Sequence, residues 1–373
     1  MEVNFSAAYS KEVENLWQQE FKRHLLPSAV HLFLLLGLGV FGNAFVFIVY
    51  QIKLKTTENR LFIPYLACTD FASCVTTTVF FITDIQYYVN FPSHIMCKVF
   101  NFFTFFFIMA SLLLQLSIAI SRYIKICHPQ RNFNYLRFEK ITIVGVFIGS
   151  ALFATPSVFV SNIKKYDVIY KQHNITGCTC QSLAGNDPLR EVVRMLLVSV
   201  IITGIIVSCC VLHSKIGIVI HRTFPGKDPG LKTKTLSIDQ EFASVESTSC
   251  TLSMSRHITA SALSLQTGLN DERVTNSKRK LRHQHRRRMN FNIMFITMLV
   301  AYTVAWAPFI GVMLFSVFHN DIWTNKTFKG LDINFYLIAR SFFITSYSAN
   351  PIIYSLFDSK FRRTVQKLLH VHR

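Results

Sequence analysis

The stretch AISRYIKICHP, residues 119–129, ends an apolar run that has no charged residue between Lys98 and Arg122. The hydrocarbon core of a bilayer is about 30 Å thick, and a helix that crosses it needs about twenty predominantly apolar residues. The run is long enough to form such a helix. Charge returns where the predicted helix leaves the membrane, as an arginine that stands between a serine and a tyrosine.

Similar apolar windows recur along the whole chain. Of its 373 residues 51% are hydrophobic and only 16% are charged, whereas a soluble domain carries about 25% charged residues. The composition therefore indicates an all-α membrane protein, and the windows predict a bundle of seven transmembrane helices. The predicted spans are residues 28–50, 61–84, 95–121, 140–161, 189–220, 290–318 and 331–357.

Lysine and arginine in the short connections predict the orientation of this bundle. They are concentrated in 51–60, in 122–140 and after 357, and such segments stay on the cytoplasmic side of a membrane. Residues 1–26 have no apolar core of the kind found in a signal peptide, so the first span must act as its own insertion signal. We expect a plasma-membrane protein with its amino terminus outside. The expected segments are an extracellular amino terminus (1–27), helices one to five (28–220), a third cytoplasmic loop (221–288), helices six and seven (289–357), and a short amphipathic eighth helix with the tail (358–373).

The third cytoplasmic loop is hydrophilic, rich in Ser and Thr between residues 233 and 264, and ends in the basic run KRKLRHQHRRR. A composition of this kind buries too little apolar surface to fold, so we expect it to be mostly disordered. Its hydroxyls are the expected sites of phosphorylation and arrestin recruitment, with low-complexity filler as the alternative. The net charge of +19 is attributed to cytoplasmic basic residues that attract anionic membrane lipid, rather than to nucleic-acid binding.

Cysteine and asparagine patterns agree with this topology. The nine cysteines have no zinc-site spacing, and three of them lie on the predicted outer side, which is an oxidising compartment. We expect one disulfide there, in which Cys97 pairs with either Cys178 or Cys180. Three glycosylation sequons also fall on predicted outer segments, at Asn4, Asn174 and Asn325.

A charged residue inside a predicted span is a functional candidate, because charge in lipid costs about 2.5 to 3.5 kcal/mol on insertion scales. Asp70 stands midway along the second span, and Asn43, Ser111 and Asn350 are deep enough in their own spans to meet it. Oxygen ligands around one carboxylate suit a hard cation, so this group could hold a sodium ion or a proton. The alternative is a buried aspartate satisfied by neighbouring hydroxyls.

Several short motifs occur in a fixed order, about one to each span. They are Gly42-Asn43, Leu66-Ala67-x-x-Asp70, Cys97 at 25 residues before Arg122, Arg122-Tyr123, Trp306-x-Pro308 and Asn350-Pro351-x-x-Tyr354. In this order they resemble the rhodopsin-like (class A) family of G-protein-coupled receptors, and the resemblance covers residues 28 to about 369. The stretches RYIKICHP and KLKTTENRLFI are also locally similar to melatonin receptors and related invertebrate receptors.

The resemblance implies a receptor whose ligand shifts an equilibrium toward an opened inner face. Prolines 308 and 351 would let helices six and seven bend. In the family the triplet that holds Arg122 begins with an acid, but here Ser121 stands in that place, and Arg288 stands near a second expected acid. We therefore expect an idle Arg122 to reach water and basal signalling to be raised. Residues implied in activation and G-protein coupling are Ser121, Arg122, Tyr123, Pro129, Pro308, Pro351, Tyr354 and Lys360.

The same resemblance implies a ligand pocket near the outer side. Thr104 stands where amine receptors carry an aspartate, and Ile344 stands where opsins carry the retinal lysine, so a biogenic amine and retinal are not expected. Arg340 would be the one clear charge of an otherwise apolar pocket, which suggests an anionic ligand or a peptide terminus; the alternative is that Arg340 faces outer water. The expected pocket residues are Thr104, Phe105, Ile108, Trp306, Phe309, Ile310 and Arg340.

Two alternative functions stay open at this point. A secondary transporter or channel would need a polar route across the membrane, for which Asp70 alone is a poor basis. A scavenging receptor that does not signal would fit Ser121 and His213, the latter standing in the approximate place of a family tyrosine. No nucleophile or metal-ligand constellation points to an enzyme, and no cofactor is expected.

Overall fold

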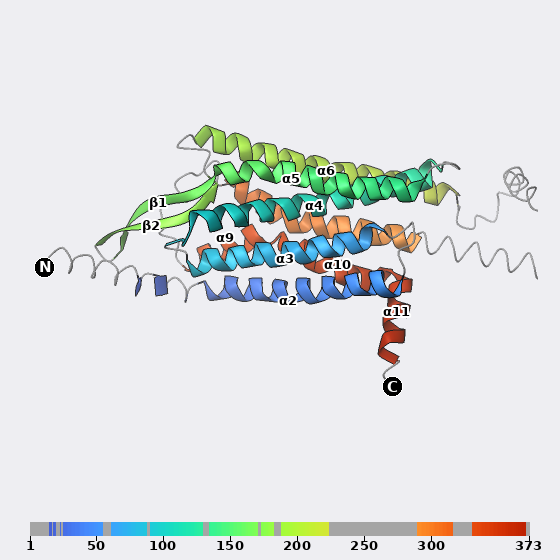
Figure 1. The fold of residues 1–373 in the computed structure, drawn as a ribbon, viewed down its shortest axis with the longest axis horizontal. Coiled ribbons are helices and arrows are strands. Elements are labelled where there is room, and N and C mark those ends of the chain that lie inside the picture. The colour runs from blue at the N-terminus through green and yellow to red at the C-terminus, as the bar shows by residue number, and fades with distance from the viewer. Residues whose placement is uncertain are drawn as a thin grey trace, which may run out of the picture. The chain divides into compact units, whose positions relative to one another are not determined.

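The computed structural model describes residues 15–16, 18–19, 23, 25–54, 61–87, 90–129, 134–170, 173–182, 188–223, 289–315 and 330–370. The chain divides into two compact units, Met1–Ile216 with Asn292–Arg373, and Gly217–Phe291. The first unit contains the helical bundle (Figure 1). In the second unit, the described residues are the end of one helix at 217–223 and the start of another at 289–291.

Within the described residues, six helices are long and apolar enough to cross a membrane. They correspond to the first six predicted spans, and their bounds are α2 Leu26–Ile48 with the π-helical turn Val49–Lys53, α3 Phe62–Gln86, α4 His94–Cys127, α5 Tyr135–Val160, α6 Pro188–Thr223, and the helix Met289–Phe315. Large apolar side chains such as Phe41 and Phe159 are 78% and 79% exposed on the outside of these helices. A surface of this kind is stable when lipid covers it.

Two of these helices differ from their predicted bounds in a way that affects the inner end. α4 continues beyond the predicted residue 121 to Cys127, so Arg122 lies within its last turns. α5 begins five residues before the predicted residue 140, because the side chain of Asn134 caps it by accepting a hydrogen bond of 3.0 Å from the Arg137 backbone N–H. Such a cap satisfies a donor that the first turn leaves open.

The seventh predicted span is present as two shorter helices, α9 Gly330–Ser341 and α10 Ile344–Phe357, of 12 and 14 residues. Between them the chain makes tight turns, in which the N–H of Thr345 donates to the Phe342 carbonyl at 3.0 Å and the N–H of Ser346 donates to that of Phe343 at 3.1 Å. Bonds of this i→i+3 type replace one stretch of α-helix. The predicted span 331–357 is therefore filled by two helices that are joined by turns.

Between α5 and α6 the chain forms an antiparallel hairpin, which the sequence analysis did not predict. Its strands are β1 Ser161–Tyr170 and β2 His173–Ser182, with Ser161 opposite Ser182 and Tyr170 opposite His173. The hairpin lies at the end of the bundle where α4 begins, and α11, Ser359–His370, leaves α10 at the opposite end (Figure 1). The fold is therefore a helical bundle with one small outer sheet.

α11 is the predicted eighth helix, and two side chains fix its start. Asp358 caps it, since Oδ1 accepts hydrogen bonds from the N–H groups of Lys360 at 2.9 Å and Phe361 at 3.3 Å. Its other oxygen accepts a 2.6 Å bond from the Tyr50 hydroxyl. The Phe361 ring is 3% exposed and stacks on Tyr50 with ring centroids 5.6 Å apart. These contacts attach α11 to the end of the first helix.

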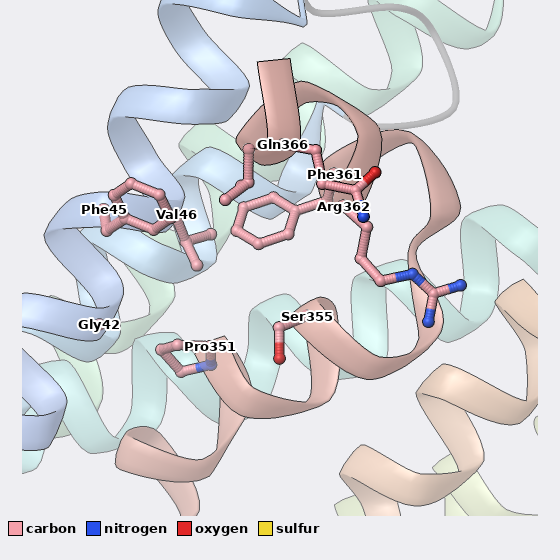
Figure 2. Close-up of a pocket in the computed structure, with 9 residues that line it drawn as sticks. Gly42, Phe45, Val46, Pro351, Ser355, Phe361, Arg362 and Gln366 are labelled. Atoms are coloured by element: carbon pink, nitrogen blue, oxygen red, sulfur yellow. The ribbon is translucent and has the colours of Figure 1, made fainter. Parts of the chain in front are cut away.

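A groove of about 250 Å³ lies between α2, α10 and α11. Figure 2 shows Phe361 of α11 on one side of it and Pro351 and Ser355 of α10 on the other. At Gly42 a Cβ atom would lie 2.8 Å from Cγ of Pro351. The glycine of the Gly42-Asn43 motif thus allows α2 to approach the proline of α10.

The Asn43 side chain donates to a backbone carbonyl of α10 that Pro351 leaves without its usual donor. Pro351 has no N–H, so the carbonyl of Tyr347, four residues earlier, lacks its usual helical donor. The side-chain amide of Asn43 donates to that carbonyl at 3.0 Å and to the Gly39 carbonyl of its own helix at 3.0 Å. Lipid offers no water to replace such a donor. The proline in α10 therefore depends on the asparagine in α2 for this hydrogen bond.

This pairing predicts a coupled effect on stability. Replacing Asn43 by alanine should destabilise the protein by about 1 to 3 kcal/mol, because the Tyr347 carbonyl loses its donor. In a Pro351→Ala background the restored backbone N–H can serve the same carbonyl, so Asn43→Ala should cost about 1 kcal/mol less. Thermal unfolding of the four proteins of this cycle in detergent measures both values. Equal costs in the two backgrounds would contradict the pairing.

Candidate functional site

The structure gathers part of the predicted polar group around Asp70. The carboxylate is 0% exposed, and its oxygens accept hydrogen bonds from the Ser111 hydroxyl of α4 at 2.7 Å and from the Asn350 amide of α10 at 2.6 Å. Asn43 is not part of this group, contrary to the prediction, because its amide is used on the Tyr347 carbonyl. Asp70 therefore joins three helices through two hydrogen bonds.

An aromatic cluster lies beside this group. Trp306 is 1% exposed and packs against Phe343 and Tyr302 with ring centroids 4.9 and 5.5 Å apart. The predicted pocket residues Ile108, Phe309 and Ile310 belong to the same apolar cluster. Thr104 is buried with a hydroxyl that has no hydrogen-bond partner among the described residues. The remaining apolar member, Phe105, is half-buried on α4.

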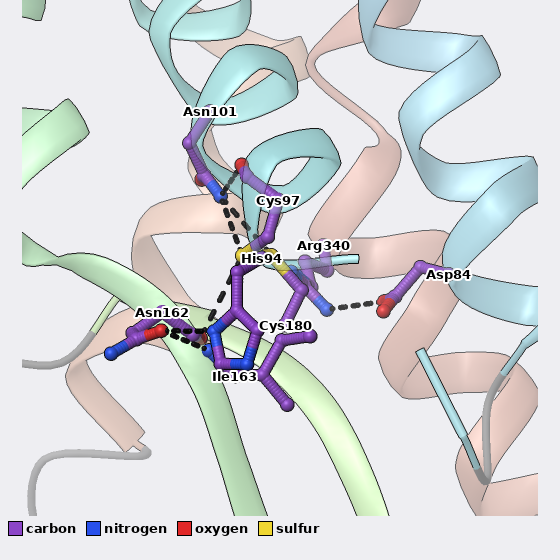
Figure 3. The surroundings of a disulfide bond; sticks show 8 residues. All are labelled: Asp84, His94, Cys97, Asn101, Asn162, Ile163, Cys180 and Arg340. Atoms are coloured by element: carbon purple, nitrogen blue, oxygen red, sulfur yellow. Dashed lines mark hydrogen bonds and ion pairs between the residues drawn. A yellow bond between two sulfur atoms is a disulfide. The ribbon is translucent and has the colours of Figure 1, made fainter. Parts of the chain in front are cut away.

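Arg340 is not the isolated charge that the sequence suggested. Its guanidinium forms an ion pair of 3.3 Å with Asp84 at the end of α3 (Figure 3). The guanidinium carbon lies 5.0 Å from the ring centroid of Phe81. The side chains of Arg340 and Asp84 are only 19% and 10% exposed. The alternative that Arg340 simply faces outer water is therefore also wrong, and Asp84 is a residue that the sequence analysis missed.

The disulfide joins Cys97 of α4 to Cys180 of β2 (Figure 3). Cys178 is a free cysteine, and its carbonyl accepts a hydrogen bond of 3.0 Å from the Phe91 N–H. The Asn101 amide lies 3.3 Å from the sulfur of Cys180. The pairing that the sequence left open is thus settled in favour of Cys180, and the hairpin is fixed to the outer end of α4.

At the inner end, Arg122 packs against the helix Met289–Phe315, which is the sixth membrane-spanning helix and is distinct from α6. Its guanidinium carbon lies 4.2 Å from the ring centroid of Phe295, and the His213 ring of α6 stacks on the same phenylalanine at 6.1 Å. Arg122 is half-buried, and the expectation that an idle arginine reaches water stays a prediction. A cation over an aromatic face is attracted by the ring quadrupole, so the Phe295 ring stabilises Arg122 in this position within the bundle.

Ser121 has a partner that the sequence analysis did not foresee. Its hydroxyl donates to Oε1 of Glu139, on α5, at 2.7 Å, and the Lys125 ammonium lies 2.6 Å from the same oxygen. Ser121 and Glu139 are 3% and 2% exposed. A carboxylate is therefore present beside the arginine triplet, but it comes from the neighbouring helix.

The sequence profile of the family described as 7 transmembrane receptor (rhodopsin family) matches residues 42–354 of this chain. The chain belongs to this family. The match confirms the resemblance drawn from the motifs and the seven-helix fold, in which α9 and α10 together form the seventh helix. The protein is accordingly a multi-pass receptor of the plasma membrane and not an enzyme.

Individual relatives match a shorter part of the receptor than the family profile does. It is 28% identical to the type-1 angiotensin II receptor B of Rattus norvegicus over 156 residues, which are 40% of this chain and 42% of that relative. It is 31% identical to the type-1 angiotensin II receptor of Meriones unguiculatus over 130 residues, 34% of this chain and 36% of that relative. The matched segment thus spans less than half of each relative. The local similarity to melatonin receptors stays a prediction.

The other predicted site residues of the receptor fall into two groups. The first group lies within the described residues. At the inner end, Tyr123 lies 3.2 Å from the His128 ring, Pro129 and Lys360 are exposed, and Tyr354 is buried against Tyr50. Pro308, further along the helix Met289–Phe315, is half-buried. Asn174 lies in β2 opposite Ile169. Asn4, Asn325, Arg288 and the Ser/Thr-rich segment 233–264 lie outside the described residues, so glycosylation and arrestin recruitment stay predictions.

Proposed function

We propose that this receptor transmits an extracellular ligand signal to heterotrimeric G proteins. The observation that carries the proposal is the contact of Arg122 with Phe295 at the inner end. A cation–π contact is worth about 0.5 to 2 kcal/mol, so a modest shift of the sixth helix would break it and uncover the arginine for a partner. Pro308 and Pro351 lie within the two helices that would bend.

The coupling is tested by nucleotide exchange on purified G proteins of each class, with the receptor in lipid nanodiscs. Phe295→Ala should raise ligand-independent exchange, because Arg122 loses its resting contact. Phe41→Ala is the matched control, since that ring is 78% exposed on α2. Absence of exchange on every G protein, in both the receptor and the variant, would favour the silent scavenging alternative. Radiolabel uptake without exchange would favour a transporter.

The ligand class is inferred from the ion pair at the outer end. Arg340 presents several N–H donors in a planar fork that suits a carboxylate, and in the structure its Nη1 donates to Oδ2 of Asp84 at 3.3 Å. A ligand with an anionic group would compete with Asp84 for Arg340 while its apolar part meets the cluster around Trp306. Thr104 in place of an aspartate argues against a biogenic amine. The relatives are named as receptors for angiotensin II, and this ligand is one candidate for the panel.

Competition between Asp84 and the ligand predicts opposite effects of two variants. Arg340→Gln should weaken an anionic agonist by about 10- to 100-fold, the equivalent of a charged hydrogen bond worth about 1.5 to 3 kcal/mol. Asp84→Asn should strengthen the same agonist, because the competing carboxylate is removed. The measurement is exchange potency for pairs of ligands that differ only in a free or an amidated carboxylate. If the amidated members respond equally to Arg340→Gln, the ligand does not bind through its anionic group.

Asp70 is also the proposed site of an allosteric sodium ion. Its carboxylate and the Ser111 hydroxyl are hard oxygen ligands, and the buried hydroxyl of Ser73, one turn further along α3, has no partner within the described residues. The hydrogen bond that Ser111 now donates to Asp70 would have to rearrange when the ion binds. The oxygen atoms of Asp70, Ser111 and Ser73 therefore fit a small monovalent cation.

Sodium binding at this place predicts a salt-specific stabilisation of the folded receptor, because an ion that binds only the folded state raises its stability. The melting temperature should be higher in sodium chloride than in potassium chloride at equal ionic strength, and Asp70→Asn should remove the difference. Asp84→Asn is the control that keeps it. A sodium effect that survives Asp70→Asn would place the ion elsewhere.

A further inference from the structure

The contact between α4 and α5 at the inner end contains a buried carboxylate that the proposed function has not yet used. Glu139 is 2% exposed, and two donors from α4, the Ser121 hydroxyl and the Lys125 ammonium, reach its Oε1 atom at 2.7 and 2.6 Å. A buried carboxylate is destabilising unless it is paired and hydrogen-bonded. The two donors therefore hold the last turns of α4 against the first turns of α5.

Arg122 follows Ser121 directly, and this neighbour relation sets its direction. Successive residues of an α-helix project about 100° apart, so when Ser121 faces Glu139 on α5, Arg122 is turned toward another side of α4. In the structure that side is occupied by Phe295. The orientation of Arg122 is consequently tied to the contact that its neighbour makes.

We propose that Glu139 is a positioning residue for Arg122, which supplies from α5 the acid that the arginine triplet lacks and keeps Arg122 on Phe295 in the resting receptor. The proposal uses the proposed G-protein coupling only for its activity readout. It replaces the expectation that Ser121 leaves the receptor without an acid and raises basal signalling: Ser121 instead connects that acid to α4. Oε2 of Glu139 has no hydrogen-bond partner in the described part of the chain, so Oε1 carries both contacts.

The first test removes the charge of Glu139 and keeps its shape. Glu139→Gln should raise ligand-independent nucleotide exchange by about tenfold, the shift in a two-state ratio that loss of a charged hydrogen bond produces. Lys140→Gln is the matched control, because this neighbour is exposed and outside the contact. Thermal unfolding of each variant in detergent shows whether a change in exchange reflects lost folding.

The second test moves the acid across the same contact. The double variant Ser121→Asp with Glu139→Ser places the carboxylate on α4 and the hydroxyl on α5, and the new acid stands four residues before Lys125, a favourable spacing on a helix. Basal exchange should return to the level of the unaltered receptor. A role limited to packing would give no such recovery, because both side chains have changed size. Raised exchange in the double variant would overturn the proposal.

A third measurement does not depend on any G protein. Spin labels at Lys140→Cys and Ile293→Cys, both exposed positions, report the distance between the inner part of α5 and that of the helix Met289–Phe315. The cysteines that could also take up the label, Cys68, Cys127, Cys178, Cys210 and Cys250, are replaced by serine. Glu139→Gln should shift the distribution to longer distances, and the double variant should reverse the shift. Failure of exchange with an intact distance response would contradict only the coupling. An unchanged distribution in Glu139→Gln would contradict the positioning role.

Discussion

A carboxylate in the middle of a membrane must be satisfied by the protein itself, because lipid supplies no donor. Asp70 meets this condition with one donor from α4 and one from α10. Neither Ser111 nor Asn350 could satisfy both oxygens alone, so the three helices must stay within hydrogen-bond distance of one another. The aromatic cluster around Trp306 then packs beside a part of the bundle whose spacing is already set.

The seventh helix shows how the same condition permits irregular backbone. It is divided near Phe342, and it contains Pro351, which removes a further backbone donor. Irregular backbone at membrane depth is tolerated only where other protein groups satisfy it, and Asn43 does so for the carbonyl of Tyr347. The first and seventh helices therefore depend on each other. A helix that is broken in this way can change its bend at a lower energetic cost than a continuous one.

Much of this arrangement could be predicted because lipid restricts what a sequence can contain. Seven apolar windows stand out against the charged connections, and a lone aspartate such as Asp70 inside a window needs partners. Asp84 and Glu139 could not be found in this way, since they stand near predicted span ends, where charge is common and carries no signal. Only the packed helices show that both are buried. The hairpin was missed because its strands carry many polar residues and form no apolar window, and because its attachment to α4 through Cys180 was one of two pairings that the sequence left open.

Glu139 places an acid beside the arginine triplet of α4 although the acid itself belongs to α5. The serine hydroxyl is short, so the Ser121 contact exists only while α4 and α5 keep their present distance and rotation. Lys125 reaches the same oxygen with a flexible four-carbon stem and can follow a rotation that the serine cannot. Rotation of α4 would therefore break the serine contact first, while the ion pair keeps the buried charge compensated. An acid held in this manner can hold the orientation of Arg122 and release it without leaving an unpaired charge in the bundle.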